Sequence, residues 1–140
     1  MIPEFINAWD KNKSILEDYF KSHKQIEYSS YVGLVKIVMH VVLNPYFIEE
    51  FGYRYDTENV TIIDDGNYQG TQIFVFHKDV YQPGVGDYVF TSSYYGSCSL
   101  CDTMEGIRDL SDSDLPSEEQ VREYMTLALH QIQGFKPLGG

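Results

Sequence analysis

Hydrophobic residues recur every three or four positions in three stretches of the chain, a spacing that places them on one face of an α-helix. The first stretch runs from Ile2 to Phe20, with lysines and acids between the hydrophobic positions. The second runs from about Ser30 to Leu43 and is more continuously apolar, so we expect it to be more buried. Asn44-Pro45 follows, and because proline disfavours helical backbone in the preceding residue, we expect the second helix to end there.

The third helical stretch begins after Ser117 and ends at Gly134. Ser117 and Gln120 have the spacing of a capping box, in which each side chain binds the backbone N–H of the other residue. A shorter helix is expected between residues 100 and 110. Residues 46–58 show no clear period, and we interpret them as a packed loop or a short edge strand.

Strand-forming residues dominate the middle of the chain. The predicted strands are residues 59–63, 72–77 and 88–95. Turn-forming residues connect the first two as a hairpin, and a segment rich in Gly and Pro connects the last two. We therefore predict a single α+β domain spanning residues 1–140. In it, a meander of about three antiparallel strands packs one face against the N-terminal and C-terminal helices.

The composition supports one folded domain and adds a strong negative charge. Of the 140 residues, 43% are hydrophobic and 15% are aromatic, which supplies enough bulky side chains for a packed core. The formal net charge of −11 disfavours direct binding to nucleic acid, because that affinity comes largely from clustered Lys and Arg, and the sequence has no such cluster. The same charge attracts a basic partner and speeds its encounter.

The start of the chain and its apolar runs indicate a cytoplasmic protein. Residues 1–4 lack the basic and apolar regions of a signal peptide. The longest apolar run, Ile37 to Leu43, is interrupted by His40 and is far shorter than a membrane span. The two cysteines are too few for a secreted disulfide scaffold. We therefore expect a cytoplasmic location and no membrane contact.

Cys98 and Cys101 form a C-x-x-C pair between a predicted strand and a predicted helix, a layout shared by thiol redox motifs and half zinc sites. Asp102 beside the second thiol opposes thiolate formation, and no second C-x-x-C or H-x-x-x-H is present. A zinc site would draw its other ligands from His40, His77, His130 or Asp102. The pair thus has three interpretations: ordinary thiols in a turn, a metal site, or a redox site.

Asp64, Asp65, His77 and Asp79 are a second group with the chemistry of a metal site or a general base. A turn around Gly66 places the first two acids at the tip of the hairpin. His77 lies about ten residues further along the chain, which is roughly 30 Å of strand. We therefore expect these acids and the imidazole to lie apart.

A pair of tyrosines and an acidic run form the predicted binding face. Tyrosine supplies a large contact area at low entropic cost, and spaced carboxylates attract basic surfaces and can imitate nucleic-acid phosphates. The residues assigned to partner binding are Tyr94, Tyr95, Asp102, Glu105, Asp109, Asp112 and Asp114.

Two blocks of the sequence, residues 64–72 (DDGNYQGTQ) and 94–102 (YYGSCSLCD), resemble uncharacterised small acidic proteins of phages and mobile elements in Gram-positive bacteria. The resemblance implies a context rather than an activity. Accessory proteins of this size and charge in such elements are often inhibitors of host defence, including anti-CRISPR proteins, and frequently act by blocking rather than by catalysis. No catalytic residues are carried over.

We predict a non-enzymatic protein-binding module without a cofactor, whose partner is a basic protein surface such as that of a host nucleic-acid-handling defence protein. Two alternatives stay open. One is a metal-binding or thiol-dependent enzyme centred on Cys98, Cys101 and His77. The other is a structural or housekeeping protein of a mobile element.

Overall fold

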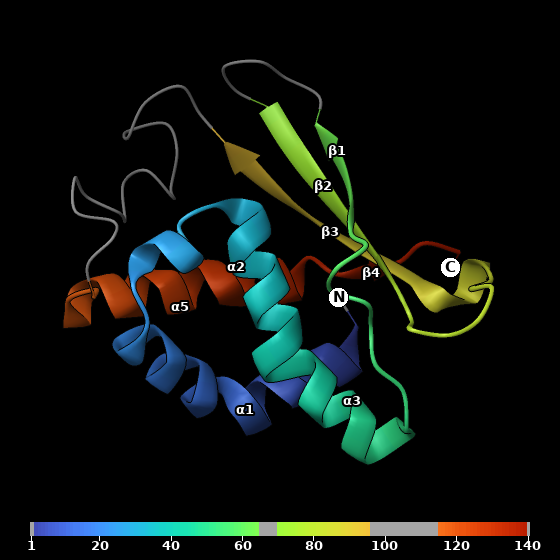
Figure 1. Cartoon of the computed structure of the whole chain (residues 1–140), viewed down its shortest axis with the longest axis horizontal. Helices are drawn as coiled ribbons and strands as arrows, with labels where there is room; N and C mark the ends of the chain where they lie inside the picture. The colour runs from blue at the N-terminus through green and yellow to red at the C-terminus, as the bar shows by residue number, and fades with distance from the viewer. Residues whose placement is uncertain (1, 65–69, 96–114, 140) are drawn as a thin grey trace.

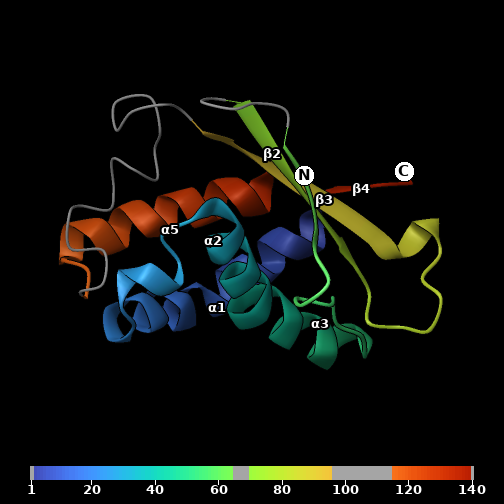
Figure 2. The ribbon, with the colours of Figure 1, turned by 45° about the horizontal axis from the view of Figure 1, so that its top comes forward.

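The computed structural model describes residues 2–64, 70–95 and 115–139, without the side chains of residues 94 and 95. In the described part of the chain, the long helices lie on one face of a single antiparallel sheet, which forms the second layer, and a short 3-10 turn at Val85–Asp87 lies at the end of the sheet (Figures 1 and 2). The elements in chain order are α1 (Pro3–Ser22), η1 (Gln25–Glu27), α2 (Tyr31–Val38), η2 (Met39–Leu43), α3 (Asn44–Phe51), β1 (Thr61–Asp64), β2 (Gly70–His77), η3 (Val85–Asp87), β3 (Tyr88–Tyr95), α5 (Glu118–Gln133) and β4 (Lys136–Pro137).

The sheet has the strand order β1-β2-β3-β4, so the predicted meander of β1, β2 and β3 is confirmed. In the register, Ile63 lies opposite Ile73 and Phe74 lies opposite Thr91. The fourth strand was not predicted, because two residues after a helix carry no strand pattern of their own. It forms where the chain leaves α5 and returns along β3, pairing Lys136 with Phe90.

The hydrophobic core lies between the sheet and the helices. Alternate residues of β2 and β3 are buried on the inner face of the sheet, including Phe74, Phe76 and Val89. Thr91 on the same face donates a hydrogen bond to the Gln131 carbonyl of α5 at 2.7 Å. The predicted α+β class, with helices from both ends of the chain covering one sheet face, is therefore confirmed.

The predicted start of α5 is confirmed in detail. The Ser117 N–H donates to Gln120 Oε1 at 2.8 Å, and the Gln120 N–H donates to Ser117 Oγ at 3.2 Å. This reciprocal pair satisfies backbone groups that a helix start leaves without partners. The predicted short helix at residues 100–110 lies outside the described residues.

The predicted end of the second helix at Asn44-Pro45 is wrong, because the helix continues to Phe51. Between α2 and α3 it widens into the π-helical turn η2, where the Asn44 N–H bonds the Met39 carbonyl five residues back. In a regular α-helix a proline ring clashes with the carbonyl four residues back, and the wider turn accommodates Pro45. Gly52 then ends α3 in the left-handed conformation, with φ of 75°.

The continuous helix from Tyr31 to Phe51 has the length and mean hydropathy of a membrane-spanning helix, with a hydropathy of 1.5 over its most apolar window. Half of that window is buried inside the protein. Core helices of soluble proteins share this length and composition, so the helix is weak support for a membrane span.

Candidate functional site

The predicted site residues fall mostly outside the part of the chain that the structure describes. These are Cys98, Cys101, Asp102, Glu105, Asp109, Asp112 and Asp114. Tyr94 and Tyr95 end β3, where their backbones pair with Thr71 and Gly70 of β2. His77 is described and lies at the end of β2, and its surroundings lead to the polar cluster below.

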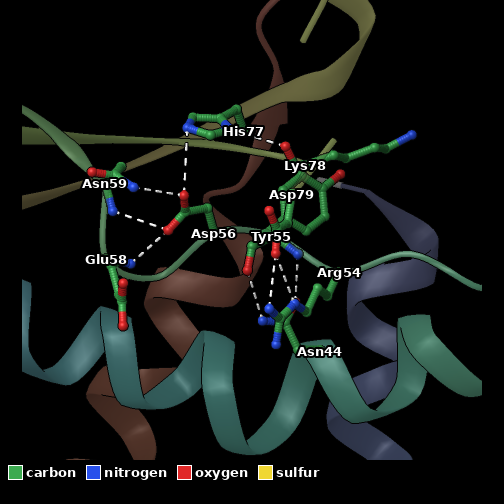
Figure 3. Close-up of polar contacts among 9 residues, drawn as sticks. All are labelled: Asn44, Arg54, Tyr55, Asp56, Glu58, Asn59, His77, Lys78 and Asp79. Atoms are coloured by element: carbon green, nitrogen blue, oxygen red, sulfur yellow. Dashed lines mark hydrogen bonds and ion pairs between the residues drawn. The ribbon is translucent and has the colours of Figure 1, made fainter. Parts of the chain in front are cut away.

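Asn44 joins the long helix to the segment that leads into the sheet (Figure 3). Its side chain is 6% exposed, and it makes two hydrogen bonds with the backbone of Tyr55. Asn44 Nδ2 donates to the Tyr55 carbonyl at 2.9 Å, and the Tyr55 N–H donates to Asn44 Oδ1 at 2.8 Å. An amide can satisfy both backbone groups at once because it carries both a donor and an acceptor. This contact fixes the chain at Tyr55, the residue that also forms an isolated β-bridge with Lys78.

Asp56 organises the turn that precedes β1 (Figure 3). Its Oδ1 accepts the N–H groups of Glu58 at 2.8 Å and Asn59 at 3.0 Å, and its Oδ2 accepts from Asn59 Nδ2 at 2.8 Å. These donors favour the ionised carboxylate, so the pKa of Asp56 is lowered below its ordinary value. The hydrogen bond from the Asn59 side chain has the largest effect, and the two backbone N–H groups and His77 add to it. Asp56 therefore stays charged, and this side chain is a poor general base at neutral pH.

His77 is held between a carbonyl and this carboxylate. Its Nδ1 lies 2.9 Å from the Lys78 carbonyl oxygen, which can only accept, so the ring proton is assigned to Nδ1. Nε2 lies 3.9 Å from Asp56 Oδ2. The separation of His77 from Asp64 is confirmed, since Asp64 pairs with Gln72 near the other end of β2. The carboxylate that does approach the imidazole comes from the turn, not from the hairpin tip.

A polar cavity of about 300 Å³ opens beside this turn. Asp79 accepts from Arg54 Nε at 3.0 Å and Nη2 at 2.8 Å on one wall, so the guanidinium is neutralised in place. Asp56 and Glu58 add further negative charge, which suits an amine or guanidinium group better than an anion. The lining residues are His40, Asn44, Arg54, Tyr55, Asp56, Thr57, Glu58 and Asp79.

A second cavity, of about 310 Å³, lies between the start of α1, the end of α3 and the sheet, and half of its lining residues are aromatic. The Lys78 ammonium lies 4.0 Å from the centre of the Tyr53 ring and 3.7 Å from Asp87 Oδ1. The Phe51 ring stacks against the Tyr53 ring with 5.8 Å between their centres, and Phe51 is 49% exposed. The cavity therefore offers an apolar surface for a side chain, and its cation is already paired.

The outer edge of the sheet is a further candidate surface. Every residue of β1 is exposed, and Ile62 and Ile63 have exposed fractions of 45% and 51%. Ile63 pairs with Ile73 on the face away from the helices. An exposed edge strand presents backbone N–H and C=O groups together with apolar side chains.

Among residues 2–64, 70–95 and 115–139, no three His, Cys, Asp or Glu side chains gather closely enough to hold a metal ion. The proposed metal and thiol chemistry of Cys98 and Cys101 lies outside those ranges and stays a hypothesis.

The roles of Asn44 and Asp56 were not predicted from the sequence pattern. Asn44 was interpreted with Pro45 as a helix stop, and nothing in the sequence distinguishes a stop from a π-helical turn. Asp56 did carry a signal, because Asp with Asn three residues later is typical of a turn in which the carboxylate binds the following N–H groups.

No family model matches this chain, and comparisons with curated proteins and with solved structures gave no match either.

Proposed function

We propose that this chain is a non-enzymatic, cytoplasmic protein-binding module that recognises a basic protein surface. The observation that carries the proposal is an exposed, isoleucine-bearing edge strand on a body with a net charge of −11. The apolar side chains supply the contact area, and the negative charge favours a partner whose surface is positively charged.

Exposed acids are spread over several elements rather than gathered in one cleft. They lie on α1, on α3, in the turn before β1 and in the first turns of α5. The exposed acids on these elements include Glu4, Asp10, Asp18, Glu49, Glu50, Glu58, Glu118, Glu119 and Glu123. Such a distribution creates a field around the whole body, which raises the rate of encounter with a basic partner and falls with ionic strength.

The sequence resemblance supports a biological setting for this binding. Small acidic accessory proteins of phages and mobile elements are often inhibitors of host defence. A body of this charge fits a host protein that handles nucleic acid, because the groove of such a protein is lined with Lys and Arg. We propose that the chain blocks such a groove, with Tyr94, Tyr95 and the acids from Asp102 to Asp114 adding to the contact.

The test has two stages. The immobilised chain first captures partners from a lysate at low salt, and the captured protein is purified. Calorimetric titrations then measure its affinity between about 50 and about 300 mM NaCl. We expect a basic partner whose affinity falls at least about tenfold over this range. An affinity that does not change with salt would contradict the electrostatic basis of the proposal, and an acidic or neutral partner would do the same.

A further inference from the structure

We infer that the outer edge of β1 is the docking site, and that it accepts an extended segment of the basic partner as an additional antiparallel or parallel strand. This inference rests on the proposed function and specifies its surface and its binding mode. Strand addition of this kind gains affinity from main-chain hydrogen bonds and specificity from alternate side chains.

The two edges of the sheet differ in how well they resist pairing. The edge strand β4 consists of Lys136 and Pro137. Proline lacks the N–H that strand pairing requires, and a charged lysine disfavours the approach of another strand. This edge is therefore protected against pairing with a further strand. The other edge strand, β1, has the sequence Thr-Ile-Ile-Asp, with neither lysine nor proline. In the described part of the chain, no strand pairs with its outer side.

The side chains of β1 offer apolar contact on both faces of an added strand. Successive residues of a strand point to opposite faces, so Ile62 lies on the helix side and Ile63 on the outer side. Both side chains are about half exposed. On the outer face, Ile63 lies beside Ile73, the residue of β2 with which it pairs. An added strand has apolar residues at alternate positions, all on one face of the sheet. They would contact Ile62 if they lie on the helix side and Ile63 if they lie on the outer side.

The charges at the two ends of β1 favour a basic occupant over a second copy of this chain. Glu58 precedes the strand and is exposed, and Asp64 ends it. Thr61 and Asp64 lie roughly 10 Å apart along the strand, and Glu58 lies in the turn before it, so a partner segment of about seven residues can place Lys or Arg near both carboxylates. Two copies, each with a net charge of −11, repel one another.

The edge is held in place before any partner arrives. β1 pairs with β2 through four residue pairs, from Thr61–Val75 to Asp64–Gln72. The Asp56 turn and the contact between Asn44 and Tyr55 fix the chain that enters the strand. A pre-organised edge loses little conformational freedom on binding.

The first test uses a library of synthetic heptapeptides with alternating apolar residues and Lys or Arg at both ends. Binding is measured by NMR, together with the hydrogen-exchange protection of the amides of Thr61 to Asp64. We expect binding peptides to protect these amides. Two methylated versions of each binding peptide are compared, one with methyl groups on the backbone nitrogens of the odd-numbered residues and one on those of the even-numbered residues. The version whose methyl groups replace the N–H groups that face β1 should bind about tenfold or more weakly. If no peptide binds, or if methylation in neither register matters, the inference is wrong.

The second test compares two variants with the partner captured at low salt. Ile63→Lys blunts the edge, and Ile48→Lys makes the same change on α3, where the side chain is 52% exposed against 51% for Ile63. Both variants gain one positive charge, so the general attraction falls equally. We expect about a tenfold loss of affinity for Ile63→Lys and less than about twofold for Ile48→Lys.

The outcomes separate this inference from the proposed function. If the two variants bind with equal affinity and the affinity still falls steeply with salt, the edge of β1 is not the docking site. The proposed function is not contradicted by that outcome. An affinity that is insensitive to salt would remove the proposed function itself. If the chain alone dimerises in sedimentation experiments and Ile63→Lys abolishes the dimer, the occupant is a second copy and the inference is overturned.

Discussion

Asn44→Ala is the change that best tests how the long helix positions the segment that enters β1. Asn44 satisfies both the N–H and the carbonyl of Tyr55, at 2.8 and 2.9 Å. Tyr55 is 5% exposed, so water does not readily replace the lost side chain. The substitution therefore leaves a buried donor and a buried acceptor unpaired just before the sheet begins.

The size of the effect follows from these two groups. Leaving one buried polar group without a partner costs about 1–3 kcal/mol, so two such groups cost about 2–6 kcal/mol. A loss of about 3 kcal/mol lowers the urea midpoint of unfolding by roughly 1–3 M, for a denaturant slope of about 1–3 kcal/mol/M. We also expect faster hydrogen exchange at the Tyr55 amide, because the segment entering β1 is released from the helix.

Urea unfolding followed by fluorescence provides the assay, since Trp9 is the single tryptophan and is buried in the core. Asn7→Ala is the control, because Asn7 is exposed on α1 and the same atoms are removed from a helix surface. If Asn44→Ala is destabilised by no more than about 0.5 kcal/mol relative to Asn7→Ala, the two hydrogen bonds do not anchor this segment.

Three further predictions concern pH and close packing. The pKa of Asp56 is lowered on folding, so its stabilising contribution is present above the unfolded value of 3.8 and is lost as the pH falls below it. Asp56→Asn should therefore flatten the acid side of the stability profile measured by urea unfolding. Burial raises the pKa of Tyr28 above its ordinary 10.0, so its contribution is present below pH 10 and is lost at higher pH. Tyr28→Phe should make alkaline destabilisation less steep, again measured by unfolding at each pH. Gly134→Ala should cost about 1–3 kcal/mol in thermal unfolding, because the new Cβ would lie 2.8 Å from Thr91 Oγ1.

Each of these predictions has a matched control. Asp10→Asn removes a carboxylate from the exposed face of α1, and Tyr81→Phe removes a hydroxyl from a side chain that is 92% exposed. Gly86→Ala adds a methyl group where nothing lies within 4 Å. The reasoning about Asp56 or Tyr28 fails if the variant and its control have parallel pH profiles. The packing argument fails if the two alanine variants have equal melting temperatures.

The sequence by itself determined the elements whose signals are local. The periods of α1 and α5, the capping box at Ser117 and the three strand-forming runs follow from side-chain spacing and turn chemistry, which short stretches of chain contain in full. The α+β class followed from the order of these elements. The negative charge is also a property of the composition.

Only the tertiary structure decided where those elements end and which side chains meet. The helix continues past Pro45 because a π-helical turn accommodates the proline ring. The Asn44 side chain then hydrogen-bonds the backbone of Tyr55, eleven residues further along the chain. β4 exists only because the chain after α5 returns along β3. Asp56 meets His77 for the same kind of reason, across a bridge between Tyr55 and Lys78. Such contacts depend on distances between segments that are remote in sequence, and no local pattern encodes them.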